Sequence, residues 1–147
     1  MSAKILIDAD ACPVTRLAEN IAKQFSLECV LVCDTSHILS SEYSEVITAS
    51  KGADCADFVL LSLVNKGDAV VTQDYGLAAL CLAKGAYALN QNGLEYTSFN
   101  IDSLLQTRHI GAQIRRAGHR TKGPRKRTLQ QDKDFEQTFK IICERLR

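Results

Sequence analysis

The 147-residue sequence has no apolar run long enough to cross a membrane. Its first apolar stretch, Ile5-Leu6-Ile7, ends at Asp8 and is too short for the apolar region of a signal peptide. The six cysteines include no CxxC pair, and the three histidines have no zinc-binding spacing with them. We therefore expect a cytoplasmic protein with free thiols and no zinc site.

Acidic residues are missing from one long segment. Between Ser103 and Gln131 there are eight Lys or Arg residues and no Asp or Glu, so this segment carries a charge of +8. The rest of the chain has ten basic and seventeen acidic residues, and the net charge of +1 hides this separation. Charge blocks of this kind often bind polyanions, which predicts a nucleic-acid partner.

The densest part of the basic segment is an arm at about 108–128. Gly118, Gly123 and Pro124 predict a loop between about 118 and 127. No aromatic residue is interleaved with the cations, which favours binding to the phosphate backbone over base stacking. A solvated loop or a site for an acidic protein is the alternative. The residues expected to bind nucleic acid, most simply single-stranded or structured RNA, are Arg115, Arg116, Arg120, Lys122, Arg125, Lys126 and Arg127.

Strands and helices alternate along the chain. Apolar patterns predict strands over 4–8, 28–33, 45–49, 69–72 and 86–89, and helices over 13–25, 54–65 and 76–83. An added edge strand at 96–99, a helix reaching about 117 and a final helix at about 131–146 are expected after them. Thr128 and Gln131 have the spacing of a capping box. We expect one domain over 1–147, an α/β fold arranged as a three-layer α/β/α sandwich around a mainly parallel, Rossmann-like sheet.

Aspartates stand where these elements begin and end. Asp8 closes the first strand and Asp74 follows the fourth, so both are expected at the carboxyl edge of a parallel sheet, where ligands bind at the switch point of the strand order. Asp54 and Asp57 lie in the first turns of a helix, where acids also favour the helix dipole. Asp10 is placed either to cap the helix near Pro13 or to join the acids.

A divalent cation would remove the repulsion between these carboxylates. Mg²⁺ and Mn²⁺ prefer oxygen ligands and keep waters that leave room for a phosphate. The predicted metal ligands are Asp8, Asp10, Asp54, Asp57 and Asp74, with Asp8 and Asp74 as the catalytic pair. Asp68 lies in a turn at the opposite end of the fourth strand and is expected to be structural. Thr72 and Gln73 could orient a ligand, whereas Cys12 is expected to pack.

Five ordered motifs resemble the YaiI/YqxD family of bacterial proteins: IDADACPV at 7–14, GADCAD at 52–57, VVTQDYGLA at 70–78, NID at 100–102 and RTKGP at 120–124. That family is grouped with PIN-like (NYN-type) nuclease domains, which cut RNA with Mg²⁺ or Mn²⁺. The resemblance implies that Asp8 and Asp74 match the acids after the first and fourth strands. Asp54 and Asp57 would replace the acids of the central helix, where PIN domains generally hold a Glu.

Two alternatives to a metal-dependent ribonuclease stay open. An apolar strand leading to Asp8-Ala9-Asp10 also resembles the nucleophile motif of haloacid dehalogenase-like phosphohydrolases, with Asp8 as nucleophile and Asp10 as acid and base. Lys51 and the pair Asp54 and Asp57 could imitate their later motifs. The second alternative is an RNA-binding module without catalysis.

Overall fold

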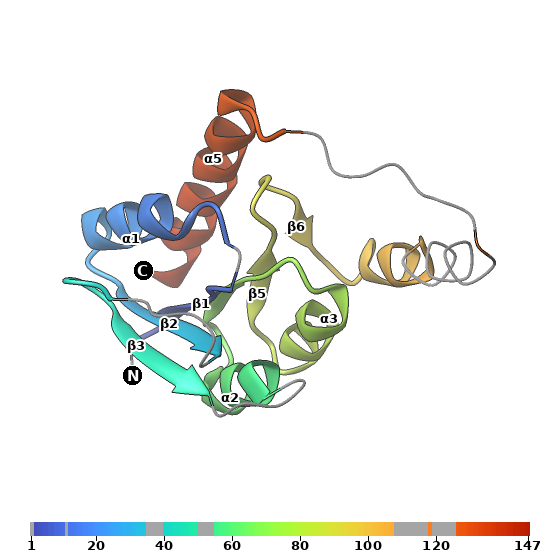
Figure 1. The fold of residues 1–147 in the computed structure, drawn as a ribbon, viewed down its shortest axis with the longest axis horizontal. Helices are drawn as coiled ribbons and strands as arrows, with labels where there is room; N and C mark the ends of the chain where they lie inside the picture. The colour runs from blue at the N-terminus through green and yellow to red at the C-terminus, as the bar shows by residue number, and fades with distance from the viewer. Residues whose placement is uncertain (1, 11, 35–39, 50–54, 108–117, 119–125) are drawn as a thin grey trace.

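A computed structural model describes residues 2–10, 12–34, 40–49, 55–107, 118 and 126–147 (Figure 1). Within these residues, six strands form one sheet in the order β3-β2-β1-β4-β5-β6. All neighbouring pairs are parallel except β5 and β6, which are antiparallel. The chain therefore builds the sheet outward on one side of β1 and then crosses to the other side at β4. The predicted three-layer α/β fold with a mainly parallel sheet is confirmed.

The elements follow the predicted alternation. They are β1 (Lys4–Asp8), α1 (Thr15–Gln24), β2 (Glu28–Asp34), β3 (Glu45–Ala49), α2 (Cys55–Leu63), β4 (Ala69–Val71), α3 (Tyr75–Ala83), β5 (Tyr87–Leu89), β6 (Glu95–Tyr96) and α5 (Leu129–Leu146). Residues 101–107 are also helical. No helix in the described part of the chain is both long enough and apolar enough to span a membrane.

Alternating side chains of the central strands serve two separate cores. In β1, Ile5 and Ile7 belong to the core beneath α1 and α5, whereas Leu6 belongs to the core beneath α2 and α3. Figure 1 shows these two pairs of helices on opposite faces of the sheet. Strands covered on both faces are apolar throughout because successive side chains point to opposite layers. The short apolar runs of the sequence are therefore buried parallel strands.

Most element boundaries lie within two residues of the predicted ones, and two of the differences have a clear local reason. Helix α1 begins at Thr15 rather than at Pro13, and the Thr15 hydroxyl donates a hydrogen bond to the Cys12 carbonyl. Strand β6 ends at Tyr96 because the chain turns there: the Thr97 amide donates to the side chain of Asn100, whose amide group donates to the Glu95 carbonyl. The expected extension of the next helix from 108 to 117 lies outside the described residues.

The start of α5 is docked against the turn between β5 and β6. The predicted capping box is present, with Thr128 and Gln131 each accepting from the other's backbone amide. Gly93 lies so close to α5 that a Cβ atom there would be 2.4 Å from the Asp134 carbonyl oxygen. The Thr138 hydroxyl also donates to the Gly93 carbonyl at 2.8 Å. This contact fixes the direction from which the chain enters α5.

Replacing Gly93 with Ala should destabilise the protein by about 2–5 kcal/mol, because the added methyl group meets backbone and the φ angle is positive. Gly67 provides a matched control: its φ is +90° but nothing lies within 4 Å of the position that a methyl group would take, so Gly67→Ala should cost only about 1–2 kcal/mol. Urea unfolding of both variants measures the difference. Equal losses would show that the approach to α5 is not tight.

Candidate functional site

The site is built around Asp8, the last residue of β1. Its neighbour on one side is β2 and on the other β4, so Asp8 stands where the strand order reverses. Asp74 follows β4 at the same carboxyl edge after Thr72 and Gln73. Ligands of open parallel sheets bind at this kind of position. As predicted, Asp8 and Asp74 lie at the carboxyl ends of two adjacent strands.

Thr72 connects the two strand ends. Its hydroxyl donates to Asp8 Oδ2 at 2.9 Å and accepts from the Asp74 amide at 3.0 Å. The Thr72 carbonyl accepts from the Tyr96 hydroxyl at 3.0 Å. Thr72 and Tyr96 are buried, so the Asp8 carboxylate is held by a well-packed side chain rather than by a mobile one. The sequence predicts that Thr72 could orient a ligand, and in this structure it orients an acid.

The pKa of Asp8 is raised from 3.8 to about 6. Burial is the largest cause, since it disfavours the charged carboxylate. The hydrogen bond from Thr72 lowers the pKa, whereas the charges of Asp57, Asp10 and Asp74 raise it further. Three other carboxylates therefore lie within electrostatic range of Asp8, although they come from separate parts of the chain.

Asp57 and Asp74 reach this edge from the starts of two helices. Asp57 lies in the first turn of α2. Asp74 is the N-cap of α3, and its Oδ1 accepts from the amides of Gly76 at 2.9 Å and Leu77 at 3.2 Å. The capping bonds explain why an acid is favourable at Asp74 without any ligand. They also fix the direction of its carboxylate beside Thr72.

Asp10 does not cap α1, whose first turn has no side-chain cap. Its carboxylate instead accepts from the backbone amide of Asp34, at 3.1 Å from Oδ2 and 3.4 Å from Oδ1. This bond ties the loop after β1 to the end of β2. Asp10 therefore lies at the acidic edge, and α1 begins without a side-chain cap.

The acidic edge also contains a residue that sequence reasoning missed. Asp34 ends β2 and is half-buried beside the Asp10 carboxylate. The signal was present in the sequence, because Asp34 follows a buried apolar strand in the same manner as Asp8. Tyr96, the partner of the Thr72 carbonyl, had no comparable signal in the sequence. Asp54, predicted as a metal ligand, lies outside the described residues, as does Lys51.

Within the described ranges, no three or more His, Cys, Asp or Glu side chains form a ready-made metal cage. A structural zinc site would need such a cage. Mg²⁺ does not, because proteins usually bind it through one or two carboxylates together with waters and substrate phosphates. The carboxylate oxygens at this edge are of the chemical type that Mg²⁺ and Mn²⁺ prefer.

Two residues near the edge have structural roles. Asp68, at the opposite end of β4, accepts from the backbone amide and the ammonium group of Lys4 and from the amide of Asn65, as expected for a structural acid. Cys12 is partly buried against the core of α1 and α5, also as expected. Burial raises the pKa of its thiol, and the nearby Asp8 adds to this while Arg127 opposes it.

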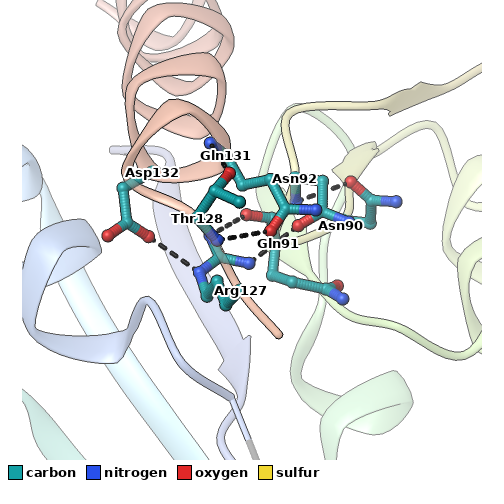
Figure 2. Close-up of polar contacts among 7 residues, drawn as sticks. All are labelled: Asn90, Gln91, Asn92, Arg127, Thr128, Gln131 and Asp132. Carbon is teal, nitrogen blue, oxygen red and sulfur yellow. Dashed lines mark hydrogen bonds and ion pairs between the residues drawn. The ribbon is translucent and has the colours of Figure 1, made fainter. Parts of the chain in front are cut away.

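Of the basic arm, the structure describes Gly118 and residues 126–128. Lys126 is exposed. Arg127 is bound to the protein itself: it donates to Asp132 at 2.8 Å, to the Asn92 side chain at 2.7 Å and to the Gln91 carbonyl at 2.6 Å (Figure 2). The remaining candidates, Arg115, Arg116, Arg120, Lys122 and Arg125, lie outside the described residues. Arg127 therefore anchors the end of the arm to the β5–β6 turn.

The fold and this edge define a three-layer α/β protein with a group of carboxylates at its switch point. The model of the family described as "Uncharacterized BCR, YaiI/YqxD family" matches residues 6–145. The chain belongs to the YaiI/YqxD family.

Relatives extend over nearly the whole chain. A UPF0178 protein of Clostridium acetobutylicum is 49% identical over 144 residues, which cover 97% of each chain. A UPF0178 protein of Exiguobacterium sibiricum is 52% identical over 136 residues, or 92% of this chain and 93% of the relative. One from Ruminiclostridium cellulolyticum is 52% identical over 139 residues, or 95% and 91%. No solved structure matches this chain significantly.

Asp8→Asn should stabilise the metal-free protein at neutral pH. Because the folded pKa of about 6 exceeds the ordinary 3.8, the unfolded chain releases the proton first, and stability falls as pH rises from about 4 to 6. The amide removes this charge and can still accept from Thr72. The gain should approach about 3 kcal/mol at pH 7.5 and be much smaller at pH 4.5.

Urea unfolding at the two pH values in the presence of a chelator measures this gain. Glu144→Gln is the control, because Glu144 is exposed near the end of α5. A gain for Asp8→Asn that is the same at both pH values would contradict the role of its charge.

Proposed function

We propose that this protein is a divalent-metal-dependent nuclease of the PIN-like kind, which cuts RNA phosphodiesters at the acidic edge. One observation carries the proposal: Asp8 at the end of β1 is within electrostatic range of three other carboxylates, from the loop after β1, from α2 and from the start of α3. Such a group is unfavourable on its own, because burial and repulsion both oppose the charged form of Asp8. A bound cation would relieve the repulsion between these carboxylates, so the site should bind a cation with a phosphate beside it.

The chain's residues divide the work at this edge. Asp8 and Asp74 are the proposed central pair, kept in place by Thr72 and by the capping bonds of α3. Asp57 and Asp10 complete the set, together with Asp54 of the same motif as Asp57. When bound, Mg²⁺ or Mn²⁺ would lower the pKa of a coordinated water and neutralise charge on the phosphate. Asp8 would then bind in its charged form, because the positive charge of the cation offsets the burial and the repulsion that raise its pKa.

The basic arm supplies the complementary part of the proposal. Arg127 holds the end of the arm on the β5–β6 turn, and its positive charge lowers the pKa of Cys12, which lies in the loop that follows β1. From this anchor, Lys126 and the preceding cations would hold the phosphate backbone near the acids. The family resemblance in the sequence supports the same assignment.

The haloacid dehalogenase alternative is less well supported by the contacts. It requires the carboxyl group of Asp10 to move protons at a substrate, and in this structure that group accepts a hydrogen bond from the Asp34 amide. Such an enzyme also makes no use of a long cationic segment. A stable phosphate analogue bound covalently to Asp8 would favour it nevertheless.

The purified protein should cut a labelled single-stranded RNA in the presence of Mn²⁺ or Mg²⁺ but not with a chelator. Asp8→Asn should reduce the rate at least about a hundredfold, because the central ligand is lost, while RNA binding is kept. Mn²⁺ should raise the melting temperature of the native protein more than that of Asp8→Asn.

Glu144→Gln serves again as the control and should cut at the native rate. Residual cutting by Asp8→Asn at the native rate would identify a contaminating nuclease and sink the proposal. Binding without cleavage under either metal would leave the non-catalytic RNA-binding alternative.

Removing the charges of Arg125 and Lys126 together should weaken RNA binding. It should also reduce the slope of log affinity against log salt concentration by about 1.4, since each phosphate contact with a single strand contributes about 0.7. Lys23→Ala with Lys133→Ala removes the same charge from exposed positions elsewhere and should change the slope little. Equal effects of the two double variants would mean that the arm is not the RNA-binding segment.

Arg127→Ala should behave differently from its neighbours. Its side chain makes three hydrogen bonds within the protein (Figure 2), so its loss should lower the free energy of unfolding by about 1–3 kcal/mol. Chemical denaturation compared with Lys126→Ala tests this. An unchanged stability would show that the anchor contributes nothing to the fold.

A further inference from the structure

A hollow of about 290 Å³ lies between α2 and α3, directly beside the acidic edge. Its floor and walls are mainly apolar, and two carboxylates stand among them. It is lined by Asp57, Phe58, Leu61, Asp74, Gly76, Leu77 and Leu80. The two carboxylates are among those that raise the pKa of Asp8. The hollow and the proposed reaction centre therefore share a border.

Two large apolar side chains of this hollow are exposed to solvent. Phe58 is 70% exposed and Leu80 is 53% exposed, although both belong to helices that otherwise bury a core face against the sheet. Adjacent exposed apolar groups beside a polar site are typical of a binding surface rather than of an ordinary helix face. Neither side chain is needed to cover the sheet, because Leu60 and Leu77 do so.

We propose that this hollow binds the unpaired nucleobase of a nucleotide next to the phosphate at the acidic edge, an inference that rests on the proposed nuclease function. Its volume of about 290 Å³ is just below the range of about 300–1,000 Å³ for ligand pockets, which suits one ring system and not a longer chain segment. The Phe58 ring supplies a face for stacking. The substrate class is then RNA that is single-stranded at the cleavage point.

The mixed lining distinguishes a base from a purely aliphatic occupant. A nucleobase has an apolar face and N–H donors on its edge, so it can contact Phe58 and Leu80 while donating to the carboxylates of Asp57 or Asp74. An aliphatic side chain of a protein partner would cover the apolar walls but bring no donor to those carboxylates, which is unfavourable. A paired base has its donor edge occupied by its partner and is held within the duplex stack. The hollow therefore selects an unpaired base.

The sequence alone did not predict a contact with a base. The basic arm has no aromatic residue, which favoured recognition of the phosphate backbone alone. Phe58 lies some fifty residues earlier in the chain and has no feature in the sequence that separates it from the other apolar residues of its helix. The fold places it next to the acids, because α2 and α3 contact each other on the same face of the sheet (Figure 1).

Binding of short fluorescein-labelled single-stranded RNAs, measured by anisotropy with Mn²⁺ in the Asp8→Asn background, which should bind RNA without cutting it, tests the inference. Phe58→Ala should weaken binding between about fivefold and a hundredfold, the range for loss of one base–aromatic contact. Phe58→Trp should restore it. Ile141→Ala is the matched control: Ile141 is 52% exposed on α5, which covers the other face of the sheet, and its loss should not change affinity.

A set of RNAs with one abasic nucleotide, moved along the strand, identifies the contact. At one position the abasic RNA should bind the protein that retains Phe58 at least as weakly as Phe58→Ala binds intact RNA, and adding Phe58→Ala to the abasic RNA should cause no further loss. Fully additive losses at every position would overturn the inference. So would an equal effect of Phe58→Ala on a blunt RNA duplex.

The outcomes separate this inference from the proposed function. If the native protein cuts RNA and Phe58→Ala cuts with an unchanged KM and unchanged binding, the nucleobase site fails while the nuclease proposal stands. If no metal supports cutting but Phe58 and one base are coupled in binding, the nucleobase site stands and the nuclease proposal fails. Thermal unfolding of Phe58→Ala should be close to native, because the side chain is exposed.

Discussion

Parallel strands end at the same edge of a sheet, and this constraint brings the acids of this protein together. Asp8 ends β1 and Asp74 follows the adjacent β4, so the fold brings two acids that repel each other to one edge of the sheet. Thr72 and the start of α3 then hold them in place. A raised pKa at Asp8 is the consequence, because a half-buried carboxylate with acidic neighbours is unfavourable in its charged form. The surrounding core must compensate for this local instability.

Much of the fold could be predicted because the strands are short, apolar and bounded by turn residues. The three central residues of the run at 4–8 and all of the run at 69–71 are buried, and strands covered on both faces leave a clear pattern in the sequence. The edge position of Asp8 followed from the same pattern. Strand β6 was harder: its end depends on Asn100, five residues beyond the Glu95 carbonyl that it binds, and a side chain that closes a turn has no periodic signal.

The candidate site could be predicted less completely, because chemical type does not reveal a side chain's partner. The spacing of Asp10 allowed it to be a helix cap. In the structure its carboxylate instead accepts a hydrogen bond from the Asp34 amide at the end of β2. Lys126 and Arg127 are equivalent in a charge count. In the fold, however, Lys126 is exposed while Arg127 spans the β5–β6 turn and α5 (Figure 2). Only a tertiary contact separates a cation that anchors from a cation that can bind a ligand.

The position of Phe58 follows from the way α2 divides its residues between its faces. Helix α2 must present Leu60 and Val64, the residue just after its end, to the sheet, and at a helical period Phe58 cannot share that face. A polar residue at position 58 would interact favourably with water and would not reduce the packing of the core. A large aromatic side chain there is unfavourable in the isolated protein, as is the charge of Asp8 nearby. The exposed Phe58 ring and the charged Asp8 carboxylate both become favourable when one ligand brings a base to Phe58 and a phosphate with its cation to Asp8.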